Sequence, residues 1–113
     1  MKKAFVLTLA AAALPFALSA ETWKNVSLMD SACAHKAEAK ANPDAHTTKC
    51  AIQCQPSGYG IVTKDGAFLP FDKAGNEKVE AALKSTKKTD HLRVDVDGEK
   101  KGDEIQVKSV TLE

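Results

Sequence analysis

The sequence predicts a small α+β fold made mainly of β-strands, and three observations support this class. Residues 92–97 alternate apolar and charged side chains, the pattern of a half-buried strand, and residues 105–112 resume an alternating pattern after a glycine-containing turn. Residues 60–71 contain two short apolar runs on either side of Asp65-Gly66, which is typical of a β-hairpin. Between these strand pairs, Asn76 is a good cap for a helix with one narrow apolar face.

The N-terminal residues have the pattern of an export signal. Lys2 and Lys3 precede an apolar run, residues 4–18, that is shorter than the roughly 20 residues a bilayer-spanning helix needs. Small residues at positions 17, 19 and 20 then offer a signal-peptidase site. We therefore expect a periplasmic or secreted protein. It has a cleaved signal peptide, residues 1–20, and a single small domain, residues 21–113, with no membrane association after cleavage.

The charge balance of the mature chain limits its partners. Without Lys2 and Lys3, fourteen basic residues face fifteen acidic ones, whereas nucleic-acid-binding proteins usually carry a basic excess. The predicted strands also lack the aromatic side chains on which bases stack. We therefore expect no nucleic-acid partner. A small molecule, a metal ion or another protein remains open as a partner.

The segment before the hairpin predicts one more strand and a helical insertion. Residues 21–29 alternate loosely and predict a first strand, which an alanine-rich polar segment follows. Asn42-Pro43 is a typical helix start, so a helix is expected from Pro43 to about Gln53. Asp30, at the end of the first strand, is expected to cap the following turn, with the orientation of a histidine or ligand as the alternative.

Two details concern the edges and curvature of the sheet. Pro70 cannot donate a hydrogen bond to a ladder, so its strand should lie at an edge or end there. After Ser109 the apolar phase slips by one residue, as it does at a β-bulge.

Five strands with a helix between the third and the fourth is the element order of a small Greek-key barrel of the OB type. The sequence thus predicts an α+β, mainly β, five-stranded OB-like barrel. A cysteine-containing helical insertion follows strand 1, and a helix lies between strands 3 and 4. Ferredoxin-like and SH3-like arrangements are the alternatives.

Five motifs are spread over nearly the whole mature chain. They are Asp30-Ser31-x-Cys33, His46…Cys50-Ala51, Ser57-Gly58-Tyr59-Gly60, Asp65-Gly66 and Val96-x-Gly98…Gly102-Asp103-x-Ile105-x-Val107. Together they resemble a family of small secreted bacterial proteins of uncharacterised function with an OB-like element order. The resemblance implies export and this fold. It implies no activity, substrate or catalytic residue.

All three cysteines and two of the three histidines lie between Asp30 and Tyr59. Three cysteines in an exported chain favour one disulfide and a spare thiol. On one helix, the Cβ atoms of Cys50 and Cys54 would be about 6 Å apart, whereas a disulfide needs roughly 3.5–4.5 Å. The leading interpretation is therefore a disulfide between Cys33 and either Cys50 or Cys54.

A metal site is the second interpretation, because thiolates and imidazoles are ligands of zinc and copper(I). A helix over residues 43–53 would place His46 and Cys54 about 12 Å apart along its axis, so the candidate ligands cannot all bind one ion. Cys33, His35 and Cys50 with either His46 or Cys54 form the expected set. The full list of candidate ligands is Cys33, His35, His46, Cys50 and Cys54.

Thiol redox chemistry at Cys33, or at Cys50 and Cys54, is the third interpretation. Cys54 near a helix C-terminus lies at the negative end of the helix dipole, which disfavours a reactive thiolate. The sequence contains no paired catalytic carboxylates and no Ser-His-Asp set, so we assign no catalytic residue. We expect a disulfide-stabilised binding or structural module without enzymatic activity and without a cofactor, unless zinc or copper binds at the cysteines and histidines.

Overall fold

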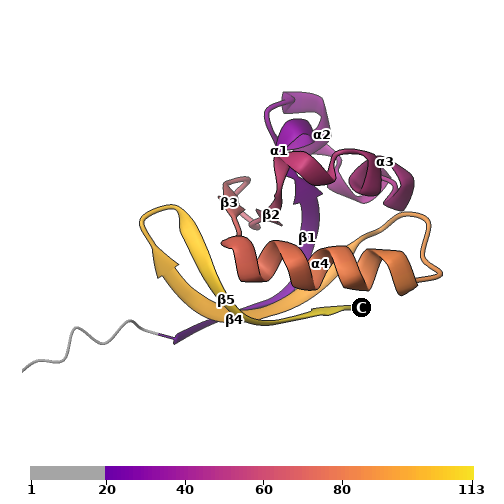
Figure 1. Ribbon diagram of the computed structural model, residues 1–113. Coiled ribbons are helices and arrows are strands. Elements are labelled where there is room, and N and C mark those ends of the chain that lie inside the picture. Colours follow the sequence, from indigo (N-terminus) through magenta and orange to yellow (C-terminus); the bar gives the residue numbers. More distant parts are fainter. Residues whose placement is uncertain (1–19) are drawn as a thin grey trace, which may run out of the picture.

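The computed structural model describes residues 20–113, and these residues form one five-stranded antiparallel sheet in the order β3-β2-β1-β4-β5 (Figure 1). The predicted α+β, mainly β class is confirmed. The predicted export signal lies outside the described residues except for Ala20, which begins β1. The strands are β1 (Ala20–Asp30), β2 (Tyr59–Val62), β3 (Phe68–Pro70), β4 (Arg93–Lys101) and β5 (Glu104–Leu112).

The helices of the described residues fall into two groups. Helices α1 (Ser31–Ala34), α2 (Ala37–Ala41) and α3 (Thr48–Gln53), with 3-10 turns η1 (Pro43–Ala45) and η2 (Gln55–Ser57), form the insertion between β1 and β2. Helix α4 (Lys73–Ser85) connects β3 to β4. Figure 1 shows the insertion gathered at one end of β1 and α4 lying across the sheet. Within residues 20–113, no helix is long and apolar enough to cross a membrane.

The edges of the sheet are strands β3 and β5. One isolated parallel bridge, between Phe71 and Ile105, joins the residue after β3 to β5. A single bridge does not close the sheet, so the barrel remains a prediction. Pro70 ends the edge strand β3, as its missing N–H predicts.

The hairpin is where the sequence predicts it, and the bulge lies close to its predicted position. The N–H of Thr63 donates to the carbonyl of Ala67 at 2.8 Å, and Gly66 has a φ of 86°, which glycine adopts without strain. In the β4–β5 pair, Asp97 lies opposite Ser109 and Gly98 opposite Val107, so Lys108 is the extra residue of a bulge. The bulge therefore lies one residue before Ser109.

Helix α4 supplies one wall of the core. Its inward residues Gly75, Val79 and Leu83 are buried, and they recur at helical spacing. The helix begins earlier than the sequence predicts. Asp72 is its N-cap and accepts the N–H of Gly75 at 3.0 Å, whereas Asn76 lies inside the helix and accepts the N–H of Tyr59 at 2.8 Å. The larger core cluster comprises Val26, Leu28, Ala51, Tyr59, Ile61, Leu69, Phe71, Val79, Leu83, Leu92, Val94, Val96, Ile105 and Val107.

The predicted helix from Pro43 to Gln53 is wrong in its middle. His46 and Thr47 have extended backbone angles, and Thr47 is the N-cap of α3, because its hydroxyl accepts the N–H of Cys50 at 3.1 Å. His46 therefore does not lie on one helix with Cys50 and Cys54. The 12 Å separation expected for His46 and Cys54 does not apply.

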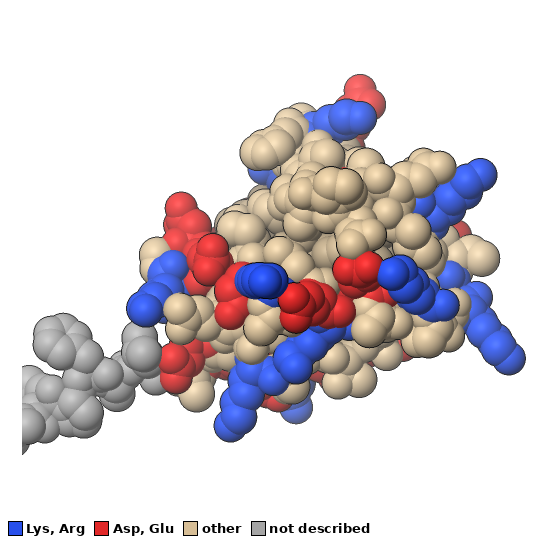
Figure 2. All heavy atoms as spheres, in the orientation of Figure 1, with Lys and Arg blue, Asp and Glu red and all other residues tan. Residues whose placement is uncertain are grey.

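The surface is mixed in charge. On the face shown in Figure 2, lysines and acidic residues alternate across the molecule, and neither sign gathers into a large patch. One such pair is Lys84 and Glu80 on α4, whose charged atoms are 2.6 Å apart. Exposed pairs of this kind contribute little to stability, roughly 0.5 kcal/mol.

Candidate metal centre

Backbone hydrogen bonds hold the start of the insertion against its end. Asp30, the last residue of β1, pairs with Tyr59, the first residue of β2. Beyond this pair, the N–H of Ser31 donates to the carbonyl of Gly58 at 2.9 Å, and the N–H of Ala32 donates to the hydroxyl of Ser57 at 3.2 Å. The entry and the exit of the insertion therefore lie side by side.

A second set of contacts fixes the middle of the insertion. The hydroxyl of Thr48 donates to the carbonyl of Lys88 at 2.7 Å, and the N–H of His91 donates to the carbonyl of Asp44 at 3.0 Å. The Arg93 guanidinium donates to both carboxylate oxygens of Asp44, at 3.1 and 2.9 Å. This hydrogen bonding holds the pKa of the Asp44 carboxyl below its usual range. These contacts lie on both sides of His46 and so fix its position.

Asp30 and His46 form a buried polar pair. Asp30 is fully buried, and its Oδ2 accepts the N–H of Cys33 at 2.9 Å, so it caps α1 as the sequence predicts. Its Oδ1 lies 2.6 Å from Nε2 of His46, whose side chain is 7% exposed. The separation is that of an ion pair, but the ring orientation gives no well-directed hydrogen bond. Neither atom has a hydrogen-bond partner among the described residues. Buried polar atoms without such partners are rare.

Cys33 completes a group of three ligand residues. A carboxylate oxygen of Asp30, the Sγ of Cys33 and a ring nitrogen of His46 all lie within 4.8 Å of one another. The Cys33 side chain is half-buried, and burial, with the nearby negative charge of Asp30, raises the pKa of its thiol to about 11. Oxygen, nitrogen and sulfur donors thus converge from the end of β1, from α1 and from the residues before α3.

Cys54 lies beside this group without belonging to it. Its thiol is half-buried at the C-terminal end of α3, close enough to the Asp30 carboxylate and the Cys33 thiol that both affect its pKa. Burial, and then the negative charge of Asp30, raises the pKa of the Cys54 thiol. The set of atoms within 4.8 Å of one another does not extend to it. All three cysteines, which lie within the described residues, are free.

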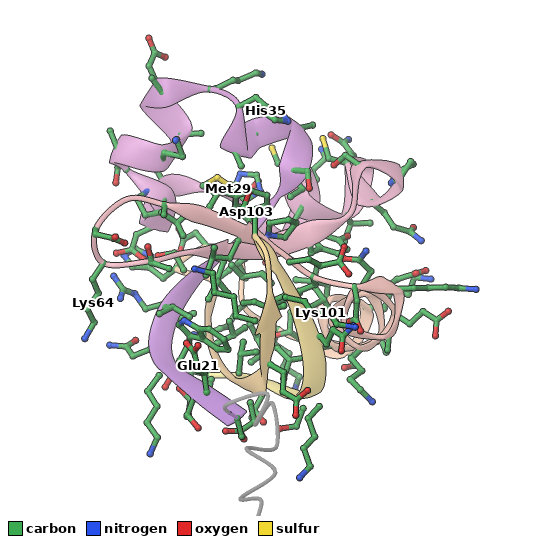
Figure 3. All side chains as sticks on the ribbon, turned by 90° about the vertical axis from the view of Figure 1, so that its left-hand side faces the viewer. Glu21, Met29, His35, Lys64, Lys101 and Asp103 are labelled. Carbon is green, nitrogen blue, oxygen red and sulfur yellow. The ribbon has the colours of Figure 1, made fainter. Side chains whose placement is uncertain are left out.

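The five ligand candidates therefore separate into two classes. Cys33 and His46 come together, with Cys54 next to them. His35 and Cys50 are exposed and stand outside the group, and Figure 3 shows His35 on the insertion, farther from the sheet than Met29. The expected set was Cys33, His35 and Cys50 with either His46 or Cys54. Among the described residues, the group of ligand atoms that lie together contains only Cys33 and His46 of this set.

Asp30 is the candidate ligand that sequence reasoning did not include, because it was expected to cap a turn or to orient a histidine or ligand. The signal that points to it is an acidic residue at the buried end of a strand, since its side chain then starts from the interior. Comparisons of the chain with protein-family models, with curated proteins and with solved structures find no match. The resemblance to small secreted bacterial proteins thus stays a prediction.

Proposed function

We propose that this protein is an exported, OB-like binding module that holds a zinc ion between Asp30, Cys33 and His46. The observation that carries the proposal is the buried pair of Asp30 Oδ1 and His46 Nε2. These atoms lack hydrogen-bond partners among residues 20–113. A carboxylate oxygen of Asp30, a ring nitrogen of His46 and the Cys33 sulfur also lie within 4.8 Å of one another. A cation between these atoms would satisfy both of them.

The distances suit zinc after a small adjustment. Bonds of about 2.0–2.2 Å to nitrogen and oxygen and about 2.3 Å to sulfur place neighbouring ligand atoms of a tetrahedral site roughly 3.3–3.6 Å apart. The 2.6 Å between Asp30 Oδ1 and His46 Nε2 has to open by about 0.7 Å, and side-chain torsions can supply this. One carboxylate and one thiolate then balance the charge of Zn²⁺, and the thiol releases its proton on binding.

The donor set favours zinc over copper(I). Zinc accepts carboxylate, imidazole and thiolate together, whereas copper(I) selects thiolates and thioethers, and a carboxylate adds little to its binding. Three protein ligands leave a fourth position for water or for another ligand. Such a site suits the binding of a further ligand at the open position, since structural zinc sites are usually closed by four protein ligands.

Two further observations support the exported, barrel-like form of the module. The residues before β1 have a signal-peptide pattern in the sequence. The parallel bridge between Phe71 and Ile105 brings the two sheet edges into contact at one point, which suits a partly open five-stranded Greek-key barrel. In this barrel the proposed metal site would lie where β1 ends and the insertion between β1 and β2 begins.

The second candidate function is a purely structural module with a disulfide between Cys33 and Cys54. The hydrogen bonds through Ser57 hold these two segments together, and Cys54 but not Cys50 affects the pKa of the Cys33 thiol, which favours this pair over Cys33 and Cys50. The oxidised protein would keep Cys50 as its spare thiol. A disulfide uses only the two thiols, whereas zinc binding also gives a role to the buried pair of Asp30 and His46, so zinc binding accounts for more of the cluster.

Titration of the reduced, metal-free protein with zinc, and with cobalt(II) as a spectroscopic substitute, tests the proposal. We expect one ion per chain and the charge-transfer absorption of a cobalt–thiolate bond. Asp30→Asn, Cys33→Ser and His46→Gln should each weaken binding by more than the roughly 10–100-fold that the loss of an outer-shell partner costs. His35→Gln and Cys50→Ser are matched controls that should bind normally.

Three results would reject the zinc site: no stoichiometric metal in the reduced protein, equal losses in His35→Gln and His46→Gln, or full affinity in Cys33→Ser. Anaerobic binding of copper(I) in preference to zinc would reject the choice of metal. Circular dichroism of each variant shows whether a loss of affinity reflects the site or the fold.

A further inference from the structure

Two cysteines that are far apart in the sequence are held next to each other by the backbone. Cys33 lies in α1, whose first residues donate to Gly58 and to the hydroxyl of Ser57. The N–H and the hydroxyl of Ser57 in turn donate to the carbonyl of Cys54, at 3.0 and 2.7 Å. This network joins the Cys33 segment to the Cys54 segment. It brings the two thiols close enough that each affects the pKa of the other.

Cys33 belongs to the candidate ligand group, whereas Cys54 does not. Cys33 lies with Asp30 and His46 in that group, and the thiol of Cys54 is its neighbour on the other side of the hydrogen-bond network. Cys54 lies outside that group, so its sulfur is available for other chemistry. Both thiols are half-buried, which leaves them open to a small reagent, and Cys50, one turn earlier, is exposed.

We propose that Cys54 is the resolving thiol of a redox switch that releases the ion. This inference rests on the proposed zinc site. The zinc-bound state and the oxidised state both use the sulfur of Cys33. As a thiolate this sulfur binds the ion, and in a disulfide with Cys54 it does not. Oxidation therefore leaves Asp30 and His46 as the remaining ligands, too few to hold zinc.

The oxidant is an external disulfide, such as glutathione disulfide. The thiolate of Cys33 attacks one sulfur of this disulfide, forms a mixed disulfide and expels the other half as a thiolate. Cys54 then loses its proton and attacks the sulfur of Cys33, which forms the internal bond and expels the second thiolate. Two protein thiols are thus oxidised to one disulfide, and one external disulfide is reduced to two thiols. Reduction by an external dithiol reverses both steps.

The test exposes the reduced, zinc-loaded protein to dilute glutathione buffers of increasing disulfide content. A chromogenic chelator reads released zinc, while alkylation and peptide mapping locate the disulfide. Dilute buffer keeps mixed disulfides rare, because only the internal bond gains from the proximity of two thiols in one chain. Cys54→Ser is the decisive variant and Cys50→Ser is its matched control.

We expect the wild-type protein and Cys50→Ser to release their zinc together with formation of a Cys33–Cys54 bond. Cys54→Ser should keep its zinc in the same buffers. Release from Cys54→Ser at the wild-type buffer ratio, or a bond that includes Cys50, would overturn the switch and leave the zinc site standing. Failure of the reduced wild-type protein to bind zinc would overturn both. The mapping of the wild-type disulfide does not depend on whether a variant folds.

Discussion

The carboxylate of Asp30 has two structural tasks, one for each oxygen. Oδ2 accepts the N–H of Cys33 at 2.9 Å and caps α1, while Oδ1 lies 2.6 Å from Nε2 of His46. One residue thus contacts both the backbone of Cys33 and the ring of His46. Because Asp30 is fully buried at the end of β1, the sheet itself positions the candidate site.

Asp30→Ala and Asp30→Asn should separate the two tasks. Alanine removes the cap, so the metal-free protein should lose about 1 kcal/mol of stability or more, because the neighbouring His46 also loses its carboxylate partner. Asparagine is about as good a cap as aspartate and should lose less, yet it should bind zinc poorly because it carries no charge. Urea unfolding without metal and zinc titration measure the two effects. Equal stability losses in the two variants would contradict the capping role.

Sequence patterns predicted those parts of the fold that depend on interactions between residues close together in the chain. The strand pair ending at Leu112, the Asp65-Gly66 turn and the bulge near Ser109 each follow from side-chain alternation or turn chemistry over a few residues. The break at Thr47 was missed because its hydroxyl competes locally with a strong helix-start signal at Asn42-Pro43.

The composition of the site was only partly predictable for a different reason. Whether Cys33 meets His46, His35 or Cys50 depends on contacts between distant segments, such as that between Arg93 and Asp44. Periodicity carries no information on such contacts. Sequence reasoning thus identified Cys33, His46 and Cys54 as candidates but could not separate them from the exposed residues His35 and Cys50.

Gly75→Ala should destabilise the protein although alanine favours helices. A Cβ at Gly75 would overlap Cγ2 of Val107 and lie 2.9 Å from Cβ of Phe71, so α4 would have to move away from β5. Overpacking of this kind typically costs 1–3 kcal/mol, against about 1 kcal/mol gained from helix propensity. Lys78→Ala, on the exposed face of α4, should change stability by less than about 0.5 kcal/mol. Thermal unfolding that shows Gly75→Ala more stable than wild type would refute this close packing.

The pKa of Asp97 should lie below its usual value. The hydroxyls of Thr22 and Ser109 donate to its two carboxylate oxygens at 2.7 and 3.1 Å, and this stabilises the charged form. The resulting stabilisation is present above the unfolded pKa of about 3.9 and is lost as pH falls through the lower folded value. Carboxyl chemical shifts followed by NMR should show this pKa rise in Thr22→Val and Ser109→Ala. An Asp97 titration identical in wild type and both variants would exclude the hydrogen bonds.

Zinc and the Cys33–Cys54 disulfide should stabilise the protein to a similar degree. Free zinc at one hundred times its dissociation constant adds about 2.7 kcal/mol to the free energy of unfolding, and closing the loop between the two cysteines adds roughly 3 kcal/mol in the chain-entropy model. The switch should therefore exchange one stabilised form for another without unfolding the chain. Urea unfolding of the reduced metal-free, reduced zinc-loaded and oxidised proteins measures both increments. Cys33→Ser should lose both, whereas Cys54→Ser should keep the zinc increment and lose the disulfide increment. If the oxidised form is no more stable than the reduced metal-free form, the disulfide strains the insertion. Cys33 and Cys54 are then not positioned to form a disulfide.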